Sequence, residues 1–267
     1  MKFSNLLLPA FFTVLLFSFS SCKKQGCTDP LASNYNSDAG EDDGSCEYYH
    51  QTDLSLHLYP MAGNEALVYN QEYSVNGRKL KFTRAQFYIS GIRLRKADNS
   101  TAAPAMPYIL FQALATEYNN GMVDTGHYSF LDLSVGVDSA SNHGDPALWG
   151  TTHPLYIGGE YSTYWTWSQG YVFMRLEGYV DSSPAGNGNA DAGFAYHVGN
   201  DEFLRTVSIA INKNLQGQAS VIELNVDFAK MLEDVDFTTE LETHSTNNKP
   251  LAEKIANKAP EAITLRP

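Results

Sequence analysis

The chain has 267 residues, with 18 Lys or Arg against 30 Asp or Glu, so its net charge is −12 at neutral pH. Such an acidic surface repels nucleic acid, which excludes nucleic acid as a partner. About 220 residues follow the last cysteine, enough for one large all-β domain.

The N-terminus has the pattern of an export signal. Lys2 precedes an apolar run from Leu6 to Phe19, which is too short to span a bilayer. Small residues then precede Cys22, and this arrangement resembles the signal of bacterial lipoproteins. We therefore predict a signal peptide at residues 1–21 and lipidation of Cys22, with a plain secretory signal as the alternative.

The lipid on Cys22 is expected to tether the protein to a membrane without a spanning segment. Lys23 and Lys24 follow the cysteine in place of the acidic residues of a surface-export signal. This difference favours the periplasmic face of the outer membrane, with the cell surface as the alternative. Removal of residues 1–21 takes away one lysine and leaves a net charge of −13.

Residues 22–49 form an acidic segment that we expect to be closed by a disulfide. If Cys22 carries lipid, Cys27 and Cys46 remain as a pair in an oxidising compartment. The segment also resembles a short motif of secreted bacterial proteins. Its carboxylates are hard oxygen ligands, so calcium binding is one hypothesis and an acidic spacer is the other. The candidate calcium ligands are Asp38, Asp42 and Asp43.

Alternation with period two predicts that residues 50–267 form one all-β domain. Leu54, Leu56 and Leu58 alternate with polar residues, as they do on a half-buried strand. We expect an antiparallel β-sandwich or a barrel-like fold. The other predicted strands are 80–83, 87–95, 128–137, 171–180, 194–198, 207–211 and 222–226.

Few helices are expected, and turn residues separate the strands. Asp227 is a candidate N-cap for a helix over 228–233, and Pro250 is expected to open a second short helix ending near Lys258. Two long loops are predicted, at 139–163 and 182–193. Breaks between strands are expected at Asn76–Gly77, Asp98–Asn99 and Asn119–Gly121.

The sequence contains no phosphate-binding glycine loop, no HExxH and no GxSxG. We therefore expect a binding protein and not an enzyme. Among the seven histidines, His57 and His197 alternate with apolar residues and should point away from the core. Imidazoles suit copper and zinc, although a solvated surface histidine is the alternative for each.

The most concentrated aromatic stretch is Tyr164–Tyr171, which holds two of the three tryptophans. If this stretch is extended, Trp165 and Trp167 point to the same face. Physical chemistry alone favours two aromatics that pack in a core. A redox or ligand site is the other interpretation.

Several motifs in order make residues 52–258 resemble the MbnP-like copper-binding proteins, which are periplasmic partners of diheme peroxidases. The combination is more specific than any single motif. The motifs are Phe87–Ser90 with Ile92–Leu94, Gly126–Tyr128, Gly136–Ser139, His153–Leu155, Tyr164–Trp167, Gly170–Tyr171, Leu176–Gly178 and Tyr196–Gly199.

The resemblance implies that Trp165 is oxidised to kynurenine by a diheme cytochrome c peroxidase of the MauG type. It also implies binding of copper, most simply Cu(I), with His197 as a ligand. His57 and His244 are our candidates for the remaining ligands. Thr163 occupies the place where several members carry a methionine. The alternative function is a non-catalytic interaction or carbohydrate-associated lipoprotein without a metal site.

Two further motifs, Glu177–Gly178 and Gly136–Asp138, are interpreted as structural. Gly178 is expected where two strands approach closely, and Asp138 is expected in a turn, with a role near the metal as the alternative for Asp138. Trp167 is expected to be a packing residue or an electron-transfer neighbour of Trp165.

Overall fold

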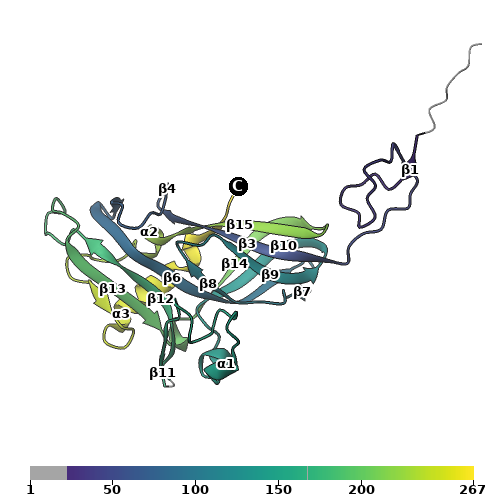
Figure 1. Cartoon of the computed structure of the whole chain (residues 1–267). Helices are drawn as coiled ribbons and strands as arrows, with labels where there is room; N and C mark the ends of the chain where they lie inside the picture. Colours follow the sequence, from purple (N-terminus) through teal and green to yellow (C-terminus); the bar gives the residue numbers. More distant parts are fainter. Residues whose placement is uncertain (1–22, 167) are drawn as a thin grey trace, which may run out of the picture. The chain divides into compact units, whose positions relative to one another are not determined.

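A computed structural model describes residues 23–166 and 168–267 (Figure 1). The predictions for the signal peptide, Cys22 and Trp167 lie outside these residues. The chain divides into two compact units, one ending at Glu47 and the other comprising Tyr48–Pro267. Within the described residues, no helix has the length and apolar character needed to cross a membrane.

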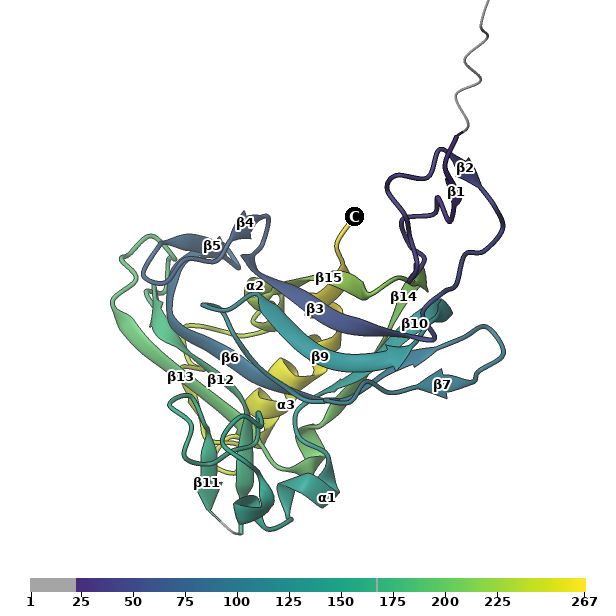
Figure 2. The same ribbon diagram turned by 45° about the vertical axis from the view of Figure 1, so that its right-hand side comes forward.

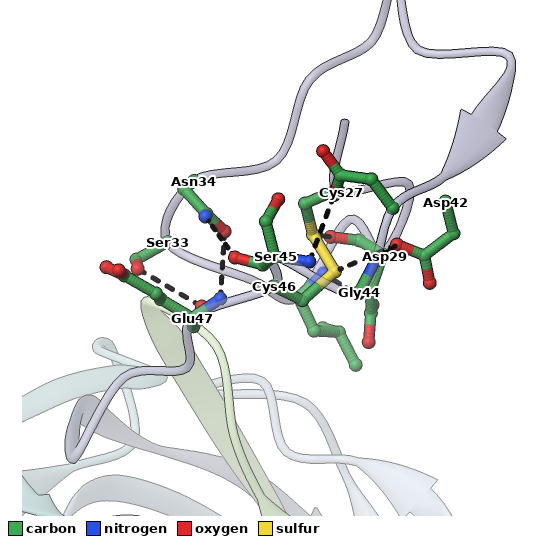
Figure 3. The surroundings of a disulfide bond; sticks show 11 residues. Cys27, Asp29, Ser33, Asn34, Asp42, Gly44, Ser45, Cys46 and Glu47 are labelled. Carbon is green, nitrogen blue, oxygen red and sulfur yellow. Dashed lines mark hydrogen bonds between the residues drawn. A yellow bond between two sulfur atoms is a disulfide. The ribbon is translucent and has the colours of Figure 1, made fainter. Parts of the chain in front are cut away.

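The smaller unit is held together by the predicted disulfide between Cys27 and Cys46 (Figure 3). Two short parallel strands, β1 (Gln25–Gly26) and β2 (Glu41–Asp42), accompany it. In residues 23–47 the buried side chains are those of Cys27 and Ala32. This is too little apolar surface for a core, so the covalent link replaces one.

The acidic side chains of this unit are turned towards local partners. Asp38 pairs with Lys24 at 3.1 Å, and Asp42 and Asp43 each accept a hydrogen bond from the backbone N–H two residues ahead. Each of the three carboxylates therefore has a local partner in the chain, and calcium binding by Asp38, Asp42 and Asp43 stays a hypothesis.

The larger unit is a β-sandwich, as predicted, and its two sheets share one core. Among the described residues, one sheet has ten strands: β5 (Tyr73–Val75), β6 (Arg78–Arg95), β7 (Thr101–Ala102), β8 (Ile109–Gln112), β10 (Gly126–Val135), β11 (Tyr164–Thr166), β12 (Gly170–Val180), β13 (Ala192–Gly199), β14 (Arg205–Leu215) and β16 (Glu242–Thr243). The other has five: β3 (Gln51–Ala62), β4 (Glu65–Ala66), β9 (Glu117–Asp124), β15 (Ala219–Asp227) and β17 (Ile263–Leu265).

Buried and exposed residues alternate along the strands, and this alternation gives each sheet one face that packs in the core of the sandwich. On β3, Leu54, Leu56 and Leu58 are fully buried while the residues between them are partly exposed. Most strand pairs are antiparallel, but β3 pairs with β15 and β13 pairs with β16 in parallel. These parallel pairs join strands that are distant in sequence, and such pairs need no tight hairpin.

Two predicted strand boundaries were wrong. The runs 80–83 and 87–95 belong to the single strand β6, whose residues 80–87 pair with β12 and 89–95 with β10. Asn119–Gly121 is a bulge inside β9 and does not separate two strands, since Leu54 faces Gly121 and Ser55 faces Asn119. Gly121 has a φ of +75°, so the chain absorbs an extra residue there without leaving the sheet.

The helices are short. Asp227 caps α2 (Phe228–Met231) through two backbone N–H groups, as predicted, and α3 (Lys249–Lys258) packs four buried residues into the core. The loop 139–163 carries α1 (Ser139–Asn142) and three 3₁₀ residues at 146–148. In both views α1 and β11 lie at the same end of the sandwich (Figure 1, Figure 2).

Candidate metal centre

The parallel pairing of β16 with β13 brings two histidines together. Tyr196 is in register with Thr243, so the next residues, His197 and His244, are neighbours on the outer face. Their ring centroids are 4.9 Å apart and the rings are perpendicular. Buried Ser245 fixes this arrangement, since its hydroxyl donates to the carbonyl of His197 at 3.1 Å.

Trp165 lies beside this pair on the hairpin formed by β11 and β12. Its ring centroid is 5.9 Å from that of His244, and 42% of the residue is exposed. The hairpin is anchored from behind, because the buried amide of Asn142 accepts the N–H of Tyr171 at 2.8 Å. Trp165 is therefore a surface residue at a pocket and not part of the core.

These residues line one open pocket of about 360 Å³. Trp165, His197 and His244 form part of its wall, and Arg175 supplies a positive charge. The other lining residues are Ser162, Thr163, Tyr164 and Val172. The open pocket therefore combines two imidazoles with an exposed indole and is accessible to small ligands or ions.

Each imidazole has a carboxylate partner. Nε2 of His197 lies 2.7 Å from Oε1 of Glu177, and Nδ1 of His244 lies 3.1 Å from Oε1 of Glu242. Arg175 donates to the same Glu177 oxygen at 2.7 Å. A carboxylate behind a histidine is the usual arrangement around histidines that bind metals in proteins.

The surroundings favour an ionised Glu177 and a neutral His197. Burial acts to raise the pKa of Glu177, but hydrogen bonds from Arg175 and His197 outweigh it and the pKa is lowered. Burial also lowers the pKa of His197, although Glu177 opposes this effect. The permanent charge of Arg175 keeps Glu177 ionised while His197 is neutral, and neutral imidazole is the form that binds metals.

His57, the third predicted histidine, is not part of this group. It lies on β3 of the five-stranded sheet, in register with Glu117 on β9 and Glu223 on β15. Alternation correctly predicted that the side chains of both His57 and His197 point away from the core. The outer faces of the two sheets of a sandwich point in opposite directions, so the two side chains diverge.

Sequence reasoning missed the outer-face role of Glu177 and interpreted it as structural together with Gly178. The interpretation of Gly178 was right, because a Cβ there would lie 2.0 Å from the carbonyl oxygen of Lys81. Alternation along β12 was the available signal, because partly exposed Arg175 and Glu177 alternate with buried Met174, Leu176 and Gly178. Both therefore share the outer face with His197.

Behind the hairpin, a second hydrophobic cluster holds Tyr88, Val137, Leu155, Tyr171 and Phe173. The ring of Tyr171 packs against that of Tyr164 at 5.1 Å between centroids. Asp138 caps α1 and accepts a hydrogen bond from Tyr108, as expected for a turn residue.

Two imidazoles are the potential metal ligands that this pocket holds. In the described part of the chain, no three His, Cys, Asp or Glu side chains are grouped so as to hold a metal ion. The pocket offers two imidazoles and, beside them, the indole of Trp165, whose N–H is a donor only. The unmodified indole therefore offers no lone pair to a metal, and the two imidazoles are the ligands that this pocket provides.

The fold and the pocket define a β-sandwich protein with paired histidines beside an exposed tryptophan. The MbnP family model matches residues 51–249, and the chain belongs to the MbnP family. The resemblance found in the sequence motifs is thereby confirmed.

Among solved structures, the chain is similar to MbnP from Methylosinus trichosporium, with 16% sequence identity and a TM-score of 0.54. The match covers 78% of this chain and 88% of that one. At this identity the likeness concerns the fold alone. A search of curated proteins found no match.

Proposed function

We propose that this chain is a lipid-anchored periplasmic protein that binds copper in copper homeostasis, through a site completed by oxidation of Trp165. Membership in the MbnP family supports a copper-related role. The observation that carries the proposal is the grouping of Trp165 with His197 and His244 around one pocket.

Oxidation converts Trp165 from a poor ligand into a good one. Cleavage of the indole C2–C3 bond would add two oxygen atoms, one from each of two molecules of hydrogen peroxide, which are reduced to two molecules of water. Hydrolysis of the resulting formamide releases formate and leaves kynurenine, which has an aryl amine and a ketone. Two neutral imidazoles with an amine nitrogen suit Cu(I).

A diheme peroxidase of the MauG type is the proposed oxidising partner. Trp165 is 42% exposed, which suits electron transfer to a second protein docked over the hairpin. Attachment through lipid on Cys22 would keep the protein at the outer membrane, facing the compartment proposed for the partner.

The test is co-expression with the diheme partner, followed by peptide mass analysis at Trp165 and Cu(I) titration against a competing chelator. His197→Ala and His244→Ala should each lower copper affinity by more than about 100-fold, beyond the effect of losing an outer-shell group. His57→Ala is the matched control, because it removes an outward-facing histidine from the opposite sheet.

Trp165→Phe should abolish both the mass change and tight copper binding while the fold is retained. The proposal is refuted if Trp165 stays unmodified and the wild-type protein takes up no copper. It is also refuted if His57→Ala weakens binding as much as His197→Ala.

A further inference from the structure

The two histidines of the pocket contact their carboxylate partners through different ring nitrogens. Glu177 contacts Nε2 of His197, whereas Glu242 contacts Nδ1 of His244. An ionised carboxylate only accepts hydrogen bonds, so the nitrogen that faces it carries the ring hydrogen. The bare lone pair is then on Nδ1 of His197 and on Nε2 of His244.

The two carboxylates differ in how firmly they are held. The side chain of Glu177 is 24% exposed and lies 2.7 Å from His197, whereas that of Glu242 is 62% exposed and lies 3.1 Å from His244. An exposed pair is screened by water and contributes little, and a partly buried pair contributes more. Of the two carboxylates, Glu177 is therefore the one that can hold its histidine in a single tautomer.

Glu177 is itself fixed by arginines on two strands. Arg175 donates to its Oε1 at 2.7 Å, and Arg84 on β6 lies 3.9 Å from its Oε2. Arg84 is also bonded to the amide oxygen of buried Gln86 at 3.1 Å. This chain of contacts leaves the carboxylate little freedom to turn away from His197.

We infer that Glu177 is a positioning residue that fixes the Nε2–H tautomer of His197 and so presents Nδ1 to the pocket as the ligand atom. The ligand role of Nδ1 rests on the proposed copper function. The tautomer does not depend on that function, because it follows from the contact between Glu177 and His197 in the metal-free protein.

The first experiment measures the ring state without metal. The metal-free protein, labelled with ¹⁵N, is studied by long-range proton–nitrogen correlation at about pH 8, above the ordinary histidine pKa of about 6.5. His197 should show a protonated Nε2 and a bare Nδ1. The spectrum of His197→Gln assigns the signals.

Two variants then test the cause. Glu177→Ala removes the acceptor, so His197 should become a mixture of tautomers, and copper affinity should fall by about 10- to 100-fold. Glu177→Gln keeps a carbonyl oxygen at the same place and should restore both the tautomer and most of the affinity. Glu117→Ala, beside His57 on the other sheet, is the matched control and should change neither.

The inference is overturned if the wild-type His197 is protonated on Nδ1, if Glu177→Ala keeps the wild-type tautomer, or if Glu177→Gln fails to restore it. Its failure is distinguishable from failure of the proposed function. A wild-type protein that binds no copper refutes the copper role, whereas the tautomer in the metal-free protein still decides the role of Glu177.

Discussion

One added methyl group at Gly170 is expected to disrupt the hairpin that carries Trp165. Gly170 has a φ of +68°, and a Cβ there would lie 2.1 Å from the side-chain oxygen of Asn142 and 2.7 Å from its backbone oxygen. The same side-chain oxygen accepts the N–H of Tyr171. In Gly170→Ala, Asn142 must therefore move and this hydrogen bond must break.

Two contributions set the size of the effect. An L-residue in the left-handed region costs about 1–2 kcal/mol. A buried Tyr171 N–H without its acceptor costs about 1–3 kcal/mol. The free energy of unfolding should therefore fall by about 2–5 kcal/mol, out of roughly 5–15 kcal/mol for a typical protein. For a domain of this size the melting temperature should fall by about 4–20 °C.

Urea denaturation of the purified protein measures the loss, and hydrogen exchange at the Tyr171 amide locates it. Gly193→Ala is the matched control, because Gly193 has no atom within 4 Å of the added Cβ. Its stability should stay within about 0.5 kcal/mol of wild type. If hydrogen exchange at Tyr171 is unchanged in Gly170→Ala and the stability falls by less than about 1 kcal/mol, the clash argument is wrong.

Three further outcomes are expected. The hydrogen bond from Arg95 lowers the pKa of Asp132, so this pair stabilises the fold above about pH 4 and loses its effect as the pH falls through the lowered value. Urea titrations should find Asp132→Asn about 1 kcal/mol less stable than wild type at pH 7, and this difference should shrink as the pH falls below about 4. Reduction of Cys27–Cys46 should raise hydrogen exchange across residues 23–47 and leave the melting transition of the sandwich unchanged, because the sandwich core belongs to residues 48–267. Gly178→Ala should cost about 1–3 kcal/mol or more in the same urea assay, because the added Cβ meets a backbone oxygen that cannot turn aside. A loss below about 1 kcal/mol would contradict the close approach of β6 and β12.

Much of the fold followed from local patterns. Alternation identified most of the longer strands, and Asp227 and Pro250 located α2 and α3, because these signals depend on neighbouring residues only. The parallel pairs β3–β15 and β13–β16 had no such signal, since they join segments far apart in the chain.

The candidate site likewise has features that the local sequence predicts and others that depend on contacts between distant segments. The sequence by itself determined that Trp165 belongs to a recognisable motif, that His57 and His197 point outward, and that Cys27 has Cys46 as its partner. These conclusions need only composition, periodicity and the order of motifs. Alternation assigns a side chain to a face of its own strand but does not say which sheet that strand joins.

Only the tertiary structure decided which histidines meet. The register of β13 with β16 placed His244 beside His197, and the opposed outer faces of the sandwich separated His57 from both. The pairing of β12 with β13 placed Glu177, which the sequence had suggested to be structural, on the same face as His197 and in contact with it. Strand pairing over long sequence distances fixes such contacts, and that pairing depends on how the whole core packs.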